Sequence, residues 1–190
     1  MHIPVSLMRK IPAKPFSSSG TIAVRRAPGS RTRALVSFAG RTEQAAIGRG
    51  GMTARKREGD GATPIAAMPL LGGYVRADRM VPPATRLSLT HMRRDMLWCD
   101  APDHACYNRP VTAPFAGRHE TLMRADGLYD VCLVMDWNIR VRRRNGGSAI
   151  FFHLVRPGYQ PTEGCIAVTL PAMRRILAFA RKGTRVKVLG

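Results

Sequence analysis

The sequence predicts a mainly β protein with one helix near its C-terminus. Apolar residues fall in short runs between glycine- and proline-bearing segments, which is the pattern of strands joined by turns. Only residues 171–182 space their apolar side chains at the intervals of a helix. With 190 residues and a hydrophobic share of 45%, the chain suits one domain with a sizeable core.

The expected strands follow one another between these turn signals. Residues 130–136 form the strongest core strand, and residues 149–154 form the next. Further segments cluster or alternate apolar residues and predict additional strands. They are residues 21–25, 33–38, 43–47, 70–76, 86–90 and 184–189.

The expected helix has a start signal, an apolar face and a stop signal. Pro171 fits the first turn of a helix. Basic residues 181–182 and Gly183 close the segment, as they do at many helix ends. The apolar face is formed by Met173, Ile176, Leu177 and Ala180.

Two loops deserve separate interpretation. Residues 48–64 are rich in glycine, but no Gly-Lys-Ser/Thr ends the run and no long helix follows, which excludes a phosphate-binding loop. Residues 92–117 contain several prolines together with Trp98 and are expected to be irregular. They form a candidate lid or substrate rim, and the alternative is a satellite hydrophobic cluster.

Net charge and the first twenty residues bear on location and partners. The chain has 31 basic and 12 acidic residues, a net charge of +19, which favours an anionic cell-wall or membrane surface as partner. No nucleic-acid-binding motif is present, so no nucleic acid is expected.

Residues 1–20 are expected to be a disordered or processed leader. Prolines interrupt any signal-peptide core there, and no apolar run is long enough to span a membrane.

The four cysteines do not form the framework of a small disulfide-rich protein. Cys99 and Cys106 flank a turn, and whether they pair is left open. Cys132 lies in an apolar run and is interpreted as a core residue. A zinc site drawn from these cysteines and nearby histidines lacks a paired Cys-x-x-Cys, so no metal and no cofactor are expected.

A histidine and a cysteine at the ends of two apolar segments carry the chemical signal. Residues 147–153 end in His153, and a short loop with proline and glycine leads to Cys165. A thiol that acts as a nucleophile needs a base such as histidine beside it, because its ordinary pKa of about 8.5 leaves little thiolate at neutral pH. Gly164 lets the backbone pass close to a reacting carbonyl, and the amides of Gly164 and Cys165 are candidate oxyanion donors. The alternative is a buried structural cysteine beside a structural histidine.

This segment resembles the active-site signature of the L,D-transpeptidase catalytic domain family, cysteine enzymes that remodel bacterial peptidoglycan. The family motif runs from a histidine through a loop to Ser/Thr-His-Gly-Cys. The matching positions are His153, Thr162, Gly164, Cys165 and Ile166, whereas Glu163 replaces a second histidine and Ala167 a common Arg or Asn. These departures resemble a divergent branch of the family. Residues 56–64, 98–100, 107–110 and 128–131 are similar to that branch too, so the resemblance covers residues 21–190.

The resemblance implies a β-sandwich or sheet with the helix packed behind a catalytic Cys165, and His153 as its base. The reaction would transfer the acyl group of a diamino-acid tetrapeptide stem through a thioacyl intermediate to an amine of a second stem, forming an L,D cross-link in the periplasm or cell wall. Attack by water would make the protein a carboxypeptidase, and attack by a protein amine would attach that protein to the wall. The alternative to an enzyme is a non-catalytic basic module that binds an anionic polymer, in which Cys165 has a structural role.

Substrate contacts are assigned to residues around the motif. Glu163 orients His153, binds the ammonium of the diamino acid or faces solvent, and these alternatives stay open. Thr162 hydrogen-bonds His153 or the substrate, or stabilises the loop. The candidates for substrate binding are Thr162, Glu163, Arg156, Tyr159 and Trp98.

Overall fold

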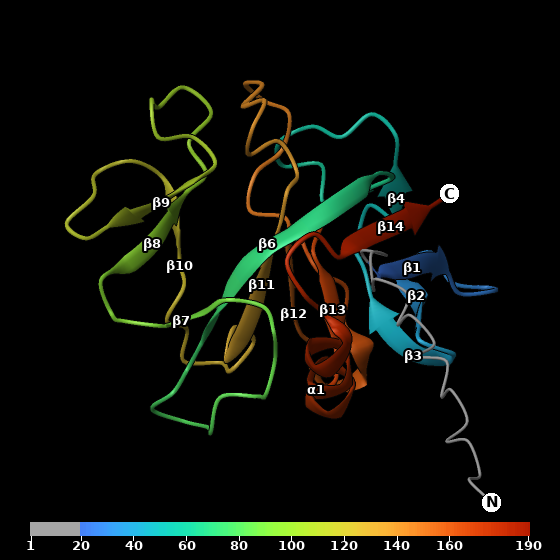
Figure 1. Cartoon of the computed structure of the whole chain (residues 1–190). Helices are drawn as coiled ribbons and strands as arrows, with labels where there is room; N and C mark the ends of the chain where they lie inside the picture. Colours follow the sequence, from blue (N-terminus) through green and yellow to red (C-terminus); the bar gives the residue numbers. More distant parts are fainter. Residues whose placement is uncertain (1–19) are drawn as a thin grey trace, which may run out of the picture.

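The protein is a closed arrangement of β-strands with a single α-helix in the part that the structure describes. The structure is a computed structural model that describes residues 20–190, so most of the expected leader lies outside the described residues. Figure 1 shows a large curved sheet, a smaller sheet beside it and the helix against the large sheet. The prediction of a mainly β fold with one helix near the C-terminus is confirmed.

The nine-stranded sheet closes on itself because one long strand pairs with several neighbours. Strand β6 (Ala67–Val75) pairs at its start with β14 (Arg185–Leu189) and over its second half with β11 (Val131–Met135). Around this ring the order continues from β11 through β12 (Phe151–Leu154), β13 (Ile166–Val168), β3 (Arg41–Ala46), β2 (Arg33–Phe38) and β1 (Thr21–Arg26) to β14, and β7 (Leu89–His91) extends β6.

Every strand predicted from the sequence is present, with shifted ends. The segment expected at residues 70–76 begins earlier, at Ala67, and the segment expected at 86–90 is the short β7. The glycine-rich loop contains two-residue strands β4 (Met52–Thr53) and β5 (Thr63–Pro64), which pair in parallel.

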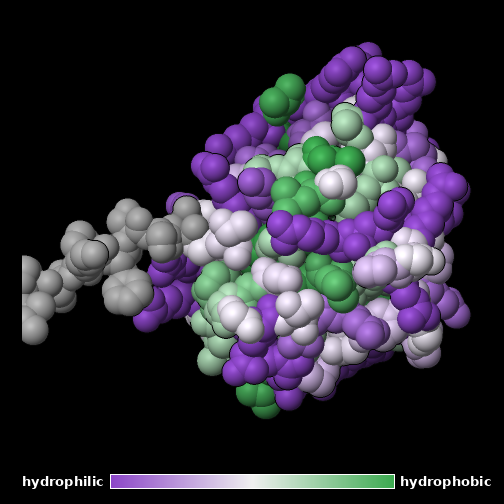
Figure 2. All heavy atoms as spheres, turned by 90° about the vertical axis from the view of Figure 1, so that its right-hand side faces the viewer, coloured by the Kyte–Doolittle hydropathy of each residue, from purple (hydrophilic) through white to green (hydrophobic). Residues whose placement is uncertain are grey.

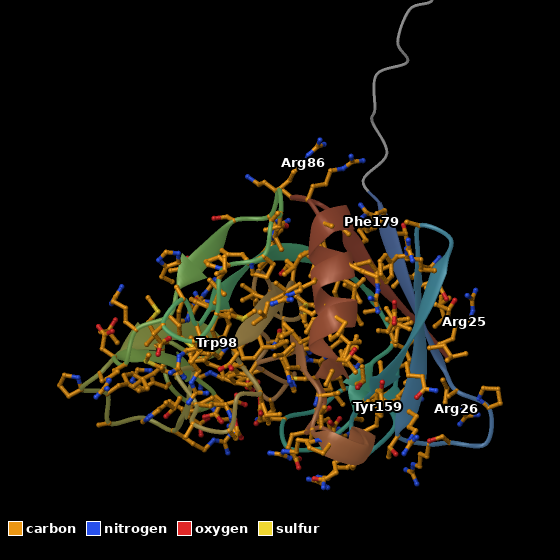
Figure 3. All side chains as sticks on the ribbon, turned by 90° about the horizontal axis from the view of Figure 1, so that it is seen from below. Arg25, Arg26, Arg86, Trp98, Tyr159 and Phe179 are labelled. Atoms are coloured by element: carbon orange, nitrogen blue, oxygen red, sulfur yellow. The ribbon has the colours of Figure 1, made fainter. Side chains whose placement is uncertain are left out.

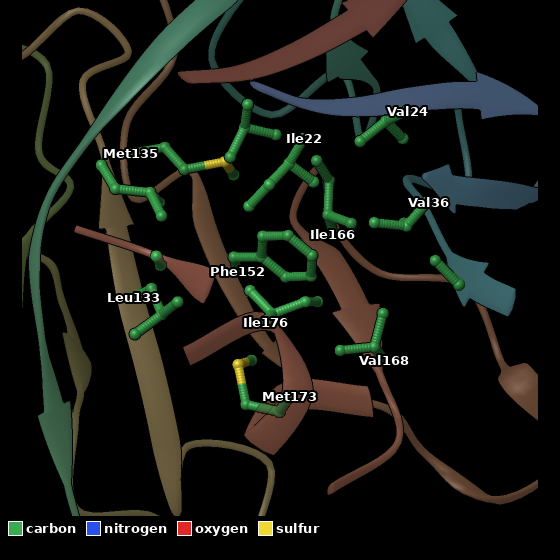
Figure 4. Packing of buried hydrophobic residues seen from close by; sticks show 14 of the residues in the cluster. Ile22, Val24, Val36, Leu133, Met135, Phe152, Ile166, Val168, Met173 and Ile176 are labelled. Atoms are coloured by element: carbon green, nitrogen blue, oxygen red, sulfur yellow. The ribbon is translucent and has the colours of Figure 1, made fainter. Parts of the chain in front are cut away.

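The main core is enclosed by the ring of strands and closed by the helix. Strand residues that alternate along the chain point into one cluster, which Figure 4 shows around Phe152 and Ile166. Phe152 and Ile166 are fully buried, and the helix adds Met173 and Ile176. Burial of so much apolar surface is the main favourable term in folding, so this cluster fixes the register of the strands around it.

The helix is shorter than predicted. Helix α1 (Leu170–Phe179) starts at Thr169, whose side chain accepts a hydrogen bond from the amide of Ala172, and it ends at Ala180, where the backbone becomes extended. The predicted apolar face is confirmed, since all four of its residues are buried. The end at residue 182 was wrong because the basic residues and Gly183 belong to the turn that leads into β14.

The expectation that residues 92–117 are irregular was wrong for two segments, which form strands, whereas the rest of the range lies in turns and loops. Together with the following residues these two segments form a second sheet of β8 (Met96–Cys99) between β9 (Arg109–Thr112) and β10 (His119–Thr121). Pro110 lies in β9, which is an edge strand, where a residue without an amide hydrogen is tolerated. The small sheet packs through Trp98 on the outer face of β12, in a second cluster that includes Phe151 and Cys165.

Charged side chains cover the exterior. Figure 2 shows one face on which hydrophilic residues predominate around scattered apolar ones, and Figure 3 shows Arg25 and Arg26 directed away from the sheet. Among the described residues, the helix is neither long nor apolar enough to cross a membrane. An anionic surface as partner stays a prediction.

We predict that Phe152→Ala lowers the free energy of unfolding by about 3–5 kcal/mol, because it removes a fully buried ring from the enclosed core. Urea denaturation at equilibrium measures this loss. Val141→Ala is the matched control, since Val141 is 82% exposed and its truncation should change stability by less than about 0.5 kcal/mol. A similar small change for both variants would contradict the assignment of the core.

Candidate active site

His153 and Cys165 are brought to the same face of the sheet by the pairing of β12 with β13. The two strands run parallel, with Phe152 opposite Ile166 and His153 opposite Ala167. Phe152 and Ile166 both point into the enclosed core. Because side chains alternate along a strand, the residues next to them point outward. His153 and Cys165 accordingly line one pocket of about 430 Å³ on the outer face.

The thiol of Cys165 is nearly enclosed by the backbone of the segment that leads into β12. Its Sγ donates a hydrogen bond to the carbonyl of Ala149 at 3.2 Å and accepts one from the amide of Phe151 at 3.3 Å. The residue is 6% exposed. Burial, and secondly the charge of Glu120, raises the pKa of the thiol to about 12, so the sulfur is protonated at neutral pH.

A hydrogen bond to the backbone fixes the ring of His153 and its tautomer. Its Nδ1 lies 2.8 Å from the carbonyl oxygen of Leu154, and since a carbonyl only accepts, Nδ1 carries the hydrogen. The lone pair is then on Nε2. Tyr129 packs edge-on against the ring at 5.1 Å between centroids. Burial lowers the pKa of His153 to about 4, so the imidazole is neutral at pH 7.

The resting pair is therefore a neutral thiol and a neutral imidazole in one pocket. The hydrogen bonds of the thiol go to backbone groups of Ala149 and Phe151, not to the imidazole. Transfer of its proton to His153 would break the hydrogen bond to the Ala149 carbonyl. A neutral imidazole with a free nitrogen is able to accept that proton as general base.

The turn before Cys165 is stabilised by Thr162. Its Oγ1 donates to the carbonyl of Cys165 at 2.7 Å and accepts from the amide of Gly164 at 3.2 Å. The Gly164 amide, considered above as an oxyanion donor, is thus engaged within the turn in this structure. Gly164 has a φ of +132°, and a Cβ there would lie 2.9 Å from the carbonyl oxygen of Ala62, so only glycine fits.

Glu163 and Arg156 lie at the rim of the pocket. The Glu163 side chain is 75% exposed and forms an ion pair with Arg49 at 2.8 Å. It therefore faces solvent and a basic residue, whereas the hydrogen bond that orients His153 comes from Leu154. Arg156 is exposed and lines the pocket on the side of His153.

Trp98 and Tyr159 do not line this pocket, and Figure 3 shows them well apart. Trp98 is 2% exposed and packs edge-on against Phe151 at 5.0 Å between centroids. Tyr159 lies under the guanidinium of Arg33, in the short 3-10 helix η1 (Pro157–Tyr159). Trp98 was expected at a substrate rim formed by residues 92–117, but the alternative of a satellite hydrophobic cluster is the one that the structure shows. Tyr159 was expected to contact substrate from the loop between His153 and Cys165, but its ring packs against Arg33 instead.

Three further charged residues of the pocket lining were not predicted one by one from the sequence. They are Lys56 and Glu58 from the glycine-rich loop and Glu120 from β10. Glu58 accepts hydrogen bonds from Tyr107 and from the hydroxyl of Ser148, and Glu120 accepts one from Tyr129 at 2.6 Å. The resemblance covers residues 56–64 and 128–131, which was the available signal, but it assigned no role to them.

The other cysteines and the zinc candidate take no part in this site. All four cysteines are free thiols, including Cys99 and Cys106, and Cys132 is fully buried. Within residues 20–190 no three His, Cys, Asp or Glu side chains are grouped as metal ligands would be.

Comparison with known proteins identifies the family. The YkuD family model, described as the L,D-transpeptidase catalytic domain, matches residues 31–188. Neither the curated proteins nor the solved structures include a significant match to the chain.

We predict that His153 makes stability depend on pH. Its pKa is about 4 in the folded protein and about 6.5 when unfolded, so only the unfolded chain binds this proton between those values. The free energy of unfolding is therefore unaffected by protonation of His153 above pH 6.5, and it decreases as the pH falls from 6.5 toward 4. Between pH 7.5 and 4.5, wild type should lose about 2–3 kcal/mol more unfolding free energy than His153→Gln in urea titrations. Equal losses in the two proteins would refute the burial of a neutral imidazole.

Proposed function

Because the chain belongs to the L,D-transpeptidase catalytic domain family, we propose that it is a cysteine acyltransferase that forms L,D cross-links between peptidoglycan stem peptides. The observation that carries this proposal is the placement of His153 and Cys165 on one face of adjacent strands, in a shared pocket with Nε2 free to accept a proton. The family acts on peptidoglycan, so we also propose that the protein works outside the cytoplasmic membrane.

In the first half-reaction, the sulfur of Cys165 attacks the carbonyl carbon between the diamino acid and the terminal D-alanine of the donor stem. His153 Nε2 takes the thiol proton as the carbon–sulfur bond forms, and the electron pair of the carbonyl moves to its oxygen. When the tetrahedral intermediate collapses, the carbon–nitrogen bond breaks and the imidazolium gives the proton to the departing amine. A thioester on Cys165 and free D-alanine result.

In the second half-reaction, an amine of another stem attacks the thioester carbon. His153 removes a proton from that amine and returns it to the departing sulfur, which restores the resting thiol and completes the amide cross-link. The resting state supports this sequence, because burial keeps the imidazole neutral and able to act as a base in both halves. Water in place of the amine gives carboxypeptidase activity from the same intermediate.

The charged walls of the pocket support a stem peptide as substrate. A stem peptide carries carboxylate and ammonium groups, and the pocket offers both signs of charge within a small volume. Its basic lining residues include Arg124 and Arg156, and its acidic ones include Glu58 and Glu120. Burial raises the pKa of the Glu120 carboxyl. A carboxylate in such a position strongly favours a cation beside it.

We predict that Cys165→Ala abolishes the covalent adduct that wild type forms with a stem tetrapeptide or a carbapenem-type acylating agent, because the sulfur that carries the acyl group is gone. Intact mass of the protein after incubation measures the adduct. Cys106→Ala removes the half-exposed thiol of β8–β9 and serves as control; it should form the adduct as wild type does. An adduct that persists in Cys165→Ala would disprove the proposed nucleophile.

We further predict that the acceptor decides the product. With donor stem and excess acceptor amine, wild type should release D-alanine and yield the cross-linked dimer, because both routes share the thioester. Liquid chromatography with mass detection distinguishes the dimer from the hydrolysed tripeptide. Tripeptide as the sole product at saturating acceptor would reassign the protein as a carboxypeptidase, and a dimer formed equally by His153→Gln would argue against the assigned base.

A further inference from the structure

Lys56 is a buried cation beside the reacting cysteine, and the proposed function does not use it. Its side chain is 3% exposed, whereas the other lysines of the described part, Lys182 and Lys187, are exposed. An ammonium is rarely buried so completely unless it is paired. Lys56 lines the same pocket as His153 and Cys165.

Gly147, on the segment that leads into β12, makes room for this lysine. A Cβ at Gly147 would lie 2.9 Å from both Cγ and Cε of Lys56, so the aliphatic part of the side chain crosses the chain there. A Cβ at Gly164 would lie 3.5 Å from Lys56 Nζ. The ammonium is therefore adjacent to the turn that presents Cys165.

Two hydrogen bonds fix the position of the ammonium. Nζ donates to Oδ1 of Asp60 at 2.5 Å and to the carbonyl of Arg57 at 3.0 Å. An ammonium has three hydrogens, and these two bonds engage two of them. Asp60 is itself held by the amides of Arg57 and Ala62, so the whole loop is organised around the charge.

The other charges near the thiol oppose its ionisation. Glu120 and Glu163 both raise the pKa of Cys165, while Lys56 lowers it. The imidazole of His153 supplies no resting positive charge, because burial keeps it neutral. When the sulfur loses its proton, the negative charge that develops needs a cation at a short distance in a site of low polarity.

We infer that Lys56 is a positioning residue of the reaction: it holds a fixed positive charge beside the Gly164–Cys165 turn and stabilises negative charge on the sulfur as the proton leaves. The proposed function supplies the reaction in which this charge is used. The effect on the thiol itself does not depend on the substrate, so a simple alkylating agent can measure it.

The test compares alkylation of Cys165 by iodoacetamide in wild type, Lys56→Met and Lys56→Arg over pH 6.5–9.5, with peptide mapping to follow residue 165 alone. Lys56→Met keeps the aliphatic volume and removes the charge. Below the pKa of the thiol the rate is proportional to the thiolate fraction. We expect Lys56→Met to react about tenfold more slowly at each pH, which is a rise of about one unit in apparent pKa, and Lys56→Arg to recover most of the rate.

Controls separate this effect from damage to the fold. Lys56→Met leaves Asp60 without its cation, so Lys56→Met/Asp60→Asn removes the pair together and is the variant to measure if the single one does not fold. Lys187→Met, on the exposed face of β14, is the matched control and should react as wild type. Unchanged alkylation of Cys165 in a folded variant that lacks the Lys56 charge would overturn the inference.

The result is distinguishable from failure of the proposed function. Slower alkylation in Lys56→Met, together with no acylation of wild type by stem peptides, would keep the role of Lys56 and reject the substrate. Acylation of wild type by stem peptides with identical alkylation profiles in wild type and Lys56→Met would keep the substrate and reject the role of Lys56.

Discussion

The register between β12 and β13 is the constraint on which the site depends. Phe152 and Ile166 face each other inside the enclosed core, so the residues beside them in each strand are directed to the opposite face. A slip of one residue in either strand would turn His153 or Cys165 into the core. Apolar burial, which has no chemical role, thereby fixes the relative placement of His153 and Cys165. The same alternation directs Phe151 into the outer cluster, where the small sheet packs.

A second consequence of this packing is that the side chains of His153 and Cys165 are both uncharged in the resting protein. His153 and Cys165 are both buried, and burial favours the uncharged form of each, so neither is charged at pH 7. The hydrogen bond from His153 Nδ1 to the Leu154 carbonyl forms with a neutral ring and leaves Nε2 available. Lys56, paired with Asp60, brings a permanent positive charge into the site without making the pocket wall strongly charged overall. Such an arrangement suits a reaction in which charge develops only transiently.

The sequence was sufficient for features governed by local pattern and insufficient for those governed by distant contacts. Strand alternation and the spacing of Met173, Ile176 and Leu177 predicted the ring strands and the helix face, and the motif identified His153 and Cys165. The prolines of residues 92–117 suggested irregular structure because edge position, which makes Pro110 acceptable in β9, is a property of the assembled sheet. Lys56 reaches the site because the distant Gly147 leaves space for its side chain, which no local pattern reveals. Trp98 was expected at a substrate rim, but it packs into the second hydrophobic cluster, which depends on the position of the small sheet and not on local sequence.

The protonated and almost fully enclosed state of Cys165 also bears on how long the protein survives. Peroxide and disulfide reagents attack the thiolate, and sulfenic acid forms first at cysteines that are ionised and accessible. A sulfur that is 6% exposed and bonded to the Ala149 carbonyl offers such oxidants little to react with. The enclosure that keeps this thiol protonated therefore also protects it from oxidation.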